Sequence, residues 1–151
     1  DTFQAGLSWR TILHKRENFR QAFNGLNHKA IAKYGKKKLK SLMKDKGIIR
    51  NRLKIEAAVK NARAFLEVQK EFGNFDKYIW QFTAHKTINN KNKRLSNIRS
   101  KSQESEAMSR DLKKRGFAFV GSTICYAYMQ GAGMVNDHLS SCPQAKLQNK
   151  K

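Results

Sequence analysis

Proline, cysteine and long hydrophobic runs are all scarce in this sequence. It holds one proline, Pro143, and nine glycines in 151 residues, so turn-forming residues are few and a helical chain is favoured over a strand-rich one. Two cysteines, Cys125 and Cys142, are too few for a disulfide scaffold and favour a reducing intracellular compartment. No apolar run approaches the roughly 18 residues that cross a bilayer, which excludes an ordinary transmembrane helix.

Acidic residues are scarce as well, and this leaves a large positive charge. Eleven Asp and Glu stand against 32 Lys and Arg, which gives a formal net charge of +21. Such an excess makes a compact chain repel itself and attracts polyanions, with nucleic acid the first candidate and a membrane surface the second. The alternative is a lysine-rich proteome, in which surface lysine carries little functional meaning. Hydrophobic residues still make up 39%, enough for one packed domain.

Apolar residues recur at three- and four-residue spacing, which predicts helices. The clearest helix spans 51–72, where Ile55, Val59 and Leu66 share one face and Gly73 marks the end. Shorter helices are predicted over 4–14, 16–23, 39–44, 75–82, 103–115 and 122–133, and a long surface loop over 87–102. The sequence therefore predicts an all-α fold, with one helical domain at 1–143 and a basic disordered tail at 144–151.

A glycine-centred turn joins the helix at 39–44 to the long helix, which predicts a helix-hairpin-helix DNA-binding motif. Gly47 would permit a positive φ, so that successive backbone N–H groups face a phosphate. Arg50, Arg52 and Lys54 would supply the cations. An ordinary helical corner with a capping glycine fits the spacing equally well, but the surrounding lysines favour phosphate binding. Such contacts position DNA without reading its sequence.

Three stretches occur together in a recognisable order and spacing. They are Phe3-Gln4-Ala5-Gly6-Leu7-Ser8-Trp9 with Lys15-Arg16-Glu17-Asn18, then Gly47-Ile48-Ile49-Arg50 with Lys54-Ile55, then Lys113-Lys114-Arg115-Gly116-Phe117 through Val120-Gly121-Ser122-Thr123-Ile124-Cys125-Tyr126 to Val135-Asn136-Asp137-His138. In these stretches the chain resembles the 3-methyladenine DNA glycosylase I family of the helix-hairpin-helix superfamily. The resemblance runs from Asp1 to about Pro143.

The resemblance implies base excision from double-stranded alkylated DNA by a monofunctional enzyme. The family hydrolyses the N-glycosidic bond of N3-methyladenine and leaves an abasic site, which requires the nucleotide to be rotated out of the stack. Trp9 matches the family's pocket tryptophan, suited to a cationic base, although a core aromatic is the alternative. Asp1 occupies the position of the family's catalytic glutamate, one methylene shorter. We further expect a monomer in the bacterial cytoplasm, associated with the nucleoid, and no membrane partner.

The family also carries a structural zinc, to which His138 and Cys142 would contribute two of four ligands. Their four-residue spacing would place both on one face of a helix, although unrelated surface residues fit the spacing too. The family's other two ligands lie upstream of Asp1, where this chain opens without an initiator methionine, and we therefore expect N-terminal residues to be missing. With half a site, the chain should hold zinc weakly. A non-catalytic basic DNA-binding module is the alternative function.

Overall fold

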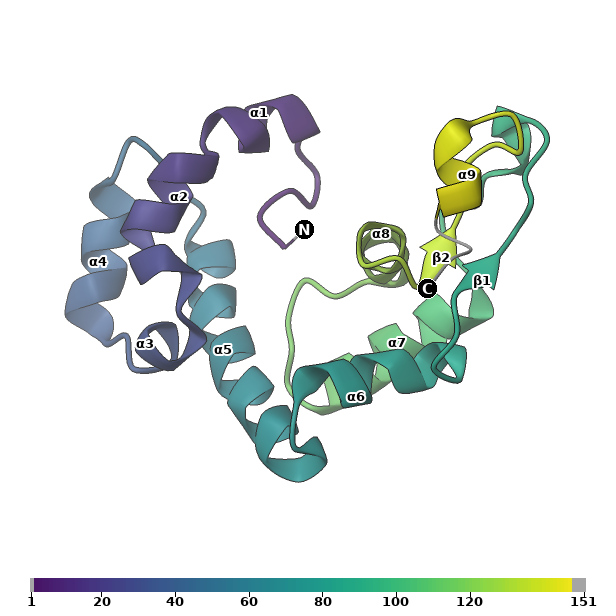
Figure 1. Cartoon of the computed structure of the whole chain (residues 1–151). Helices are drawn as coiled ribbons and strands as arrows, with labels where there is room; N and C mark the ends of the chain where they lie inside the picture. Colours follow the sequence, from purple (N-terminus) through teal and green to yellow (C-terminus); the bar gives the residue numbers. More distant parts are fainter. Residues whose placement is uncertain (1, 148–151) are drawn as a thin grey trace. The chain divides into compact units, whose positions relative to one another are not determined.

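The computed structural model describes residues 2–147, and within them helices predominate (Figure 1). This confirms the all-α fold class predicted from the sequence. The described chain divides into two compact units, one formed by residues 2–75 with 112–120 and the other by residues 76–111 with 121–147. No helix within residues 2–147 is long and apolar enough to cross a membrane. The domain boundaries predicted above stay a prediction.

The first unit is built around α5 (Arg52–Phe72). Asn51 caps this helix, because its side-chain oxygen accepts a hydrogen bond from the Lys54 N–H at 3.1 Å, and Gly73 ends it with φ 82°. The preceding elements are α1 (Trp9–His14), α2 (Arg16–Ala22), η1 (Asn24–Leu26), α3 (His28–Ala32) and α4 (Lys36–Lys44), of which α3 and α4 pack against α5. The core consists of buried side chains from these helices and the turn before α5: Phe19, Phe23, Ile31, Leu42, Ile48, Ile55, Val59 and Ala62.

The second unit combines helices with one short pair of strands. Its elements are α6 (Phe75–Trp80, from its second residue), η2 (Gln81–Thr83), η3 (Leu95–Asn97), α7 (Gln103–Lys114, up to Asp111), α8 (Ser122–Gly131) and α9 (Pro143–Leu147). The strands β1 (Ile88–Asn89) and β2 (Val135–Asn136) lie side by side in Figure 1 and pair in parallel, with Ile88 opposite Val135. Its core includes Tyr78, Met108, Cys125, Tyr126, Met129 and Met134.

Three of the predicted segments need correction, and one helix was missed. The helix predicted over 4–14 begins only at Trp9, and the segment 87–102 contains β1 and η3 rather than loop alone. The helix α3 was not predicted, because five residues are too few to show a helical period. Residues 144–147, predicted as part of a disordered tail, lie in α9, where Ala145 O accepts from Asn136 Nδ2 at 3.1 Å. The remaining tail residues, 148–151, lie outside the described residues.

Candidate functional site

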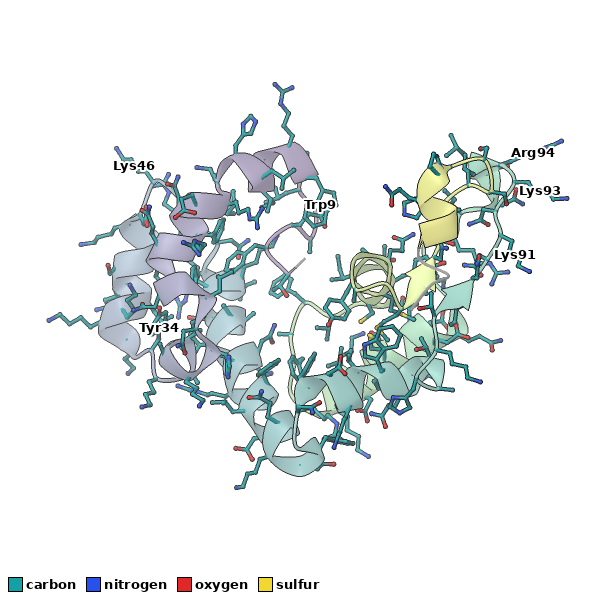
Figure 2. All side chains as sticks on the ribbon, viewed as in Figure 1. Trp9, Tyr34, Lys46, Lys91, Lys93 and Arg94 are labelled. Atoms are coloured by element: carbon teal, nitrogen blue, oxygen red, sulfur yellow. The ribbon has the colours of Figure 1, made fainter. Side chains whose placement is uncertain are left out.

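Trp9 stands at the end of a tight loop in the first unit and is open to solvent. Gly6 has φ 75°, and the Leu7 N–H donates to Gln4 O at 2.7 Å, so the chain turns before α1 begins. The Ser8 side chain then caps α1 by accepting from a backbone N–H. Trp9 is the first residue of α1 and is 48% exposed (Figure 2). The alternative of a core aromatic is therefore wrong, and the indole is available to a ligand.

Lys54 anchors the loop that precedes Trp9 and is not a surface cation. Its side chain is only 5% exposed, and Nζ donates to Phe3 O at 3.0 Å and to Ala5 O. The same ammonium lies 5.9 Å from the centre of the Phe119 ring. Burial lowers the pKa of Lys54 from its usual value. The prediction that Lys54 binds DNA phosphate is thus wrong, because both its position and its hydrogen bonds commit it to the loop.

The segment around Phe119 is fixed to α5 by one amide side chain. Asn61 donates from Nδ2 to Ala118 O at 3.0 Å and accepts from the Ala118 N–H at 2.8 Å. Phe119 itself has φ 56°, a left-handed conformation that is uncommon for an aromatic residue. Asn61 and Phe119 were missed in the sequence, because a single amide or aromatic residue carries no motif. Asn61 thus holds the segment whose Phe119 ring lies near the Lys54 ammonium.

Gly47 plays a different part from the one predicted. It does not have a positive φ, and its N–H donates to Asp45 Oδ1 at 2.7 Å, so that N–H is not free for a phosphate. Its carbonyl accepts from Lys15 Nζ and Asn18 Nδ2, each at 3.2 Å. A Cβ at this position would lie 3.2 Å from Asn18 Cβ, which explains the glycine by close packing rather than by backbone conformation.

Two of the predicted phosphate-binding cations do lie at the surface of the turn between α4 and α5. Arg50 and Arg52 are both exposed. Arg52 is partly neutralised, because its Nε donates to Glu56 Oε1 at 2.7 Å, and this hydrogen bond and charge raise the pKa of the guanidinium. Arg50 has no carboxylate partner among the described residues. Of these two arginines, Arg50 is therefore the fully available cation, and Arg52 is shared with Glu56.

The two predicted zinc ligands lie close together in the second unit. Cys142 Sγ is 3.8 Å from His138 Nδ1. They occupy a turn after β2 rather than a helix, in which the Cys142 N–H donates to Leu139 O at 2.7 Å. Within residues 2–147 no group of three or more His, Cys, Asp or Glu side chains gathers where it could hold a metal. Asp1, the predicted catalytic carboxylate, lies outside the described residues, and its role stays a prediction.

Asp137, next to His138, is the best-satisfied buried carboxylate described in the second unit. Oδ1 accepts from Asn90 Nδ2 at 2.7 Å and Asn92 Nδ2 at 2.9 Å, and Oδ2 accepts from the Tyr126 hydroxyl at 2.7 Å and Gln130 Nε2 at 2.8 Å. Burial raises the pKa of Asp137, but these hydrogen bonds outweigh it and leave the pKa below its ordinary value. With every lone pair engaged, this group is suited to holding structure together.

Comparison with known proteins gives consistent matches over most of the chain. The family model for methyladenine glycosylases matches residues 1–145. A DNA-3-methyladenine glycosylase of Haemophilus influenzae is 49% identical over 140 residues, which cover 93% of this chain and 76% of that protein. DNA-3-methyladenine glycosylase 1 of Escherichia coli is 44% identical over 139 residues, which cover 92% of this chain and 74% of that protein.

Solved structures of related enzymes also match over most of this chain. A crystal structure of a 3-methyladenine DNA glycosylase I matches with a TM-score of 0.89 and 41% identity. The match covers 94% of this chain and 78% of the chain in that structure. The enzyme from Staphylococcus aureus, solved to explain 3-methyladenine recognition, has a TM-score of 0.91 at 30% identity, with 95% of this chain and 77% of its own covered.

Proposed function

This chain belongs to the methyladenine glycosylase family, and from that membership we propose that it is a DNA-3-methyladenine glycosylase acting on alkylated double-stranded DNA. The observation that carries the proposal is the family match over residues 1–145, with identities of 44% and 49% to two bacterial enzymes of that name. The net charge of +21 suits a polyanionic substrate. A monomer that works on the nucleoid in the bacterial cytoplasm fits this activity.

The chemistry asks little of the protein beyond holding the base and stabilising charge. N3-methyladenine is cationic while attached to the sugar, so it is already a good leaving group. The nucleotide must be rotated out of the duplex before the N-glycosidic bond can be reached. The exposed indole of Trp9 offers a π face to such a cation, and Asp1 would supply a carboxylate that stabilises the positive charge of the transition state. Hydrolysis then releases the free base and leaves an abasic site.

Lys54 contributes by position rather than by contact with the base. Its hydrogen bonds to Phe3 O and Ala5 O fix the short segment between Asp1 and Trp9. Because a misplacement of about 1 Å can cost roughly a hundredfold in rate, a buried anchor for this segment matters to catalysis. The Phe119 ring lies near the same ammonium, and Asn61 fixes the backbone of the neighbouring Ala118.

Structural zinc remains a proposal that rests on His138 and Cys142. Two ligands on a tetrahedral zinc would lie about 3.5 Å apart, given usual zinc–nitrogen and zinc–sulfur distances. The 3.8 Å between Cys142 Sγ and His138 Nδ1 fits that geometry. When bound, the metal would tie this turn to whatever supplies the other two ligands, which the described residues do not. The zinc would stabilise the fold and take no part in the chemistry.

A single-turnover excision assay on methylated duplex tests the proposed function. Wild-type chain should release N3-methyladenine, and Trp9→Ala should lower the rate roughly tenfold, which corresponds to about 1.4 kcal/mol of lost cation–π attraction. Leu13→Ala is the matched control, because Leu13 is an exposed apolar residue of the same helix, 57% accessible. Affinity for undamaged duplex should change little in either variant. Binding without any excision by the wild-type chain would favour the non-catalytic module instead.

A further inference from the structure

A second concentration of positive charge lies in the second unit, away from the turn between α4 and α5 in sequence. Residues 86–101 contain six cations and no acidic residue, and all six are exposed: Lys86, Lys91, Lys93, Arg94, Arg99 and Lys101. Lys101 pairs with Glu106 at 3.1 Å. Among the described residues, no carboxylate pairs with the other five. Like charges gathered this densely without counter-charges repel one another.

The loop that carries most of these cations is held firmly in place. Asn92 is buried at 6% exposure, and its Nδ2 donates to Asp137 Oδ1 at 2.9 Å. The Asn92 carbonyl accepts from the Ser140 N–H at 2.8 Å, and the Asn90 N–H donates to Asn136 O at 3.2 Å. The loop is thus fastened to the segment after β2 through a buried carboxylate that Tyr126 also contacts. A loop fixed in this way presents its charges in a defined geometry.

Asn92 is flanked by Lys91 and Lys93, both of which face solvent. Figure 2 shows Lys91, Lys93 and Arg94 extending outward from the ribbon at one edge of the second unit. The same loop also forms a polar recess of about 320 Å³. It is lined by Asn90, Lys91, Asn92, Lys93, Asn97 and Arg99. Ammonium, guanidinium and amide groups are all hydrogen-bond donors, and a recess lined by them suits an oxyanion.

We infer that residues 91–99, here named the basic loop, form a second surface that binds the phosphate backbone of DNA. This inference rests on the proposed function, which supplies DNA as the partner. Because the backbone of this loop is already fixed, phosphate binding costs it little backbone entropy and orders only the side chains that make the contacts. An anionic membrane is the weaker fit, because the basic loop offers only Leu95 and Ile98 as exposed large apolar side chains and no extended apolar face.

The test compares two variants that lose the same charge. The loop variant combines Lys91→Gln, Lys93→Gln and Arg94→Gln. The control variant combines Lys70→Gln, Lys113→Gln and Lys114→Gln, three exposed lysines of the first unit near the C-terminal ends of α5 and α7. The dissociation constant for an undamaged duplex is measured by fluorescence anisotropy between about 50 and 200 mM salt.

The slope of log affinity against log salt should become shallower by about 0.9 for each phosphate contact that the loop variant loses. The control variant should keep the wild-type slope and the wild-type excision rate. The loop variant should also need a higher enzyme concentration for half-maximal single-turnover excision. Equal slopes for the two variants would overturn the inference, as would loss of binding to phosphatidylserine vesicles with an unchanged DNA slope. A wild-type chain that binds DNA but excises nothing would refute the proposed function while the slopes still decide on the basic loop.

Discussion

At the scale of single residues, Lys54 shows where sequence patterns stop being informative. In the sequence it is one more lysine beside Arg50 and Arg52, at the start of an amphipathic helix. In the structure its ammonium is buried against carbonyl groups 49 and 51 positions away along the chain. A helical period identifies which face a residue lies on, but it cannot show that a distant loop covers that face.

Replacing Lys54 with methionine should weaken both the fold and the reaction. Methionine keeps most of the apolar stem but leaves the carbonyls of Phe3 and Ala5 without their donor. The free energy of unfolding should fall by about 2 kcal/mol, measured by urea denaturation. Single-turnover excision should fall as well, because the loop leading to Trp9 loses its anchor.

Lys60→Met provides the control for this change. Lys60 is an exposed residue of the same helix, so the same substitution there should alter stability by no more than about 0.5 kcal/mol. If Lys54→Met were as stable and as active as Lys60→Met, the two hydrogen bonds of Lys54 would be of no consequence to the fold or the site.

Asp137 is another residue whose role only the structure reveals. It lies in one of the stretches that carry the family resemblance, yet a single aspartate beside a histidine has no recognisable spacing. Its donors come from the 90–92 segment and from α8, which are brought together only when β1 pairs with β2. The same burial and the same hydrogen bond to Asp137 raise the pKa of the Tyr126 hydroxyl.

At the scale of elements, segments with a clear apolar period were predicted well, whereas the shortest elements, α3 and the two strands, were missed. α5 was predicted within one residue of its observed start, since Asn51 and Gly73 carry the capping chemistry of both ends. The strands β1 and β2 hold two residues each and lie 46 or more positions apart, so no local pattern could have paired them. The turn between α4 and α5 was placed correctly, whereas the backbone of Gly47 was not.

We expect the two arginines of the turn between α4 and α5 to contribute unequally to DNA binding. Arg50→Gln should make the salt dependence of DNA affinity shallower by about 0.9, the value for one phosphate contact. Arg52→Gln should have a smaller effect, because Glu56 already neutralises part of that charge at 2.7 Å. Glu56→Gln should strengthen binding by freeing Arg52. The measurement is duplex affinity across a salt series.

Lys70→Gln is the control for these arginine variants, since Lys70 is an exposed cation near the other end of α5. Its slope should equal that of the wild-type chain. Identical slopes for Arg50→Gln and Lys70→Gln would remove this turn from the DNA interface, whatever the basic loop does.

The turn after β2 makes a prediction about zinc. If His138 and Cys142 are the only two ligands that this chain offers, zinc affinity should fall well short of the roughly 10–16 kcal/mol of closed structural sites. His138→Ala and Cys142→Ala should each abolish what binding there is, whereas His85→Ala, at an exposed histidine, should not. Titration against a zinc indicator measures this. Tight binding that survives both substitutions would mean that other side chains hold the metal.

At the scale of the whole molecule, the most prominent property is the excess of positive charge. Even if every one of the 11 carboxylates paired with a cation, 21 of the 32 lysines and arginines would lack a partner. The sequence predicted this property completely, because net charge needs no structure. It could not predict where the charge is held in fixed positions, since Asn92 fastens the basic loop through contacts to residues 137 and 140.

The uncompensated charge predicts opposite salt responses for the free and the DNA-bound protein. Raising potassium chloride from about 0.1 to 1 M shortens the screening length from about 10 to 3 Å, which weakens the repulsion among the cations of the free chain. If this screening raises the free energy of unfolding by about 1–2 kcal/mol, the Tm of the free protein should rise by roughly 2–8 °C. In the presence of duplex the Tm should instead fall over the same range, because salt removes the bound DNA that stabilises the fold.

Differential scanning fluorimetry of both samples measures the two trends. Chloride is preferred to sulfate, which stabilises proteins by exclusion from their surface. A free-protein Tm that stays level or falls with salt would show that self-repulsion does not limit the stability of this fold.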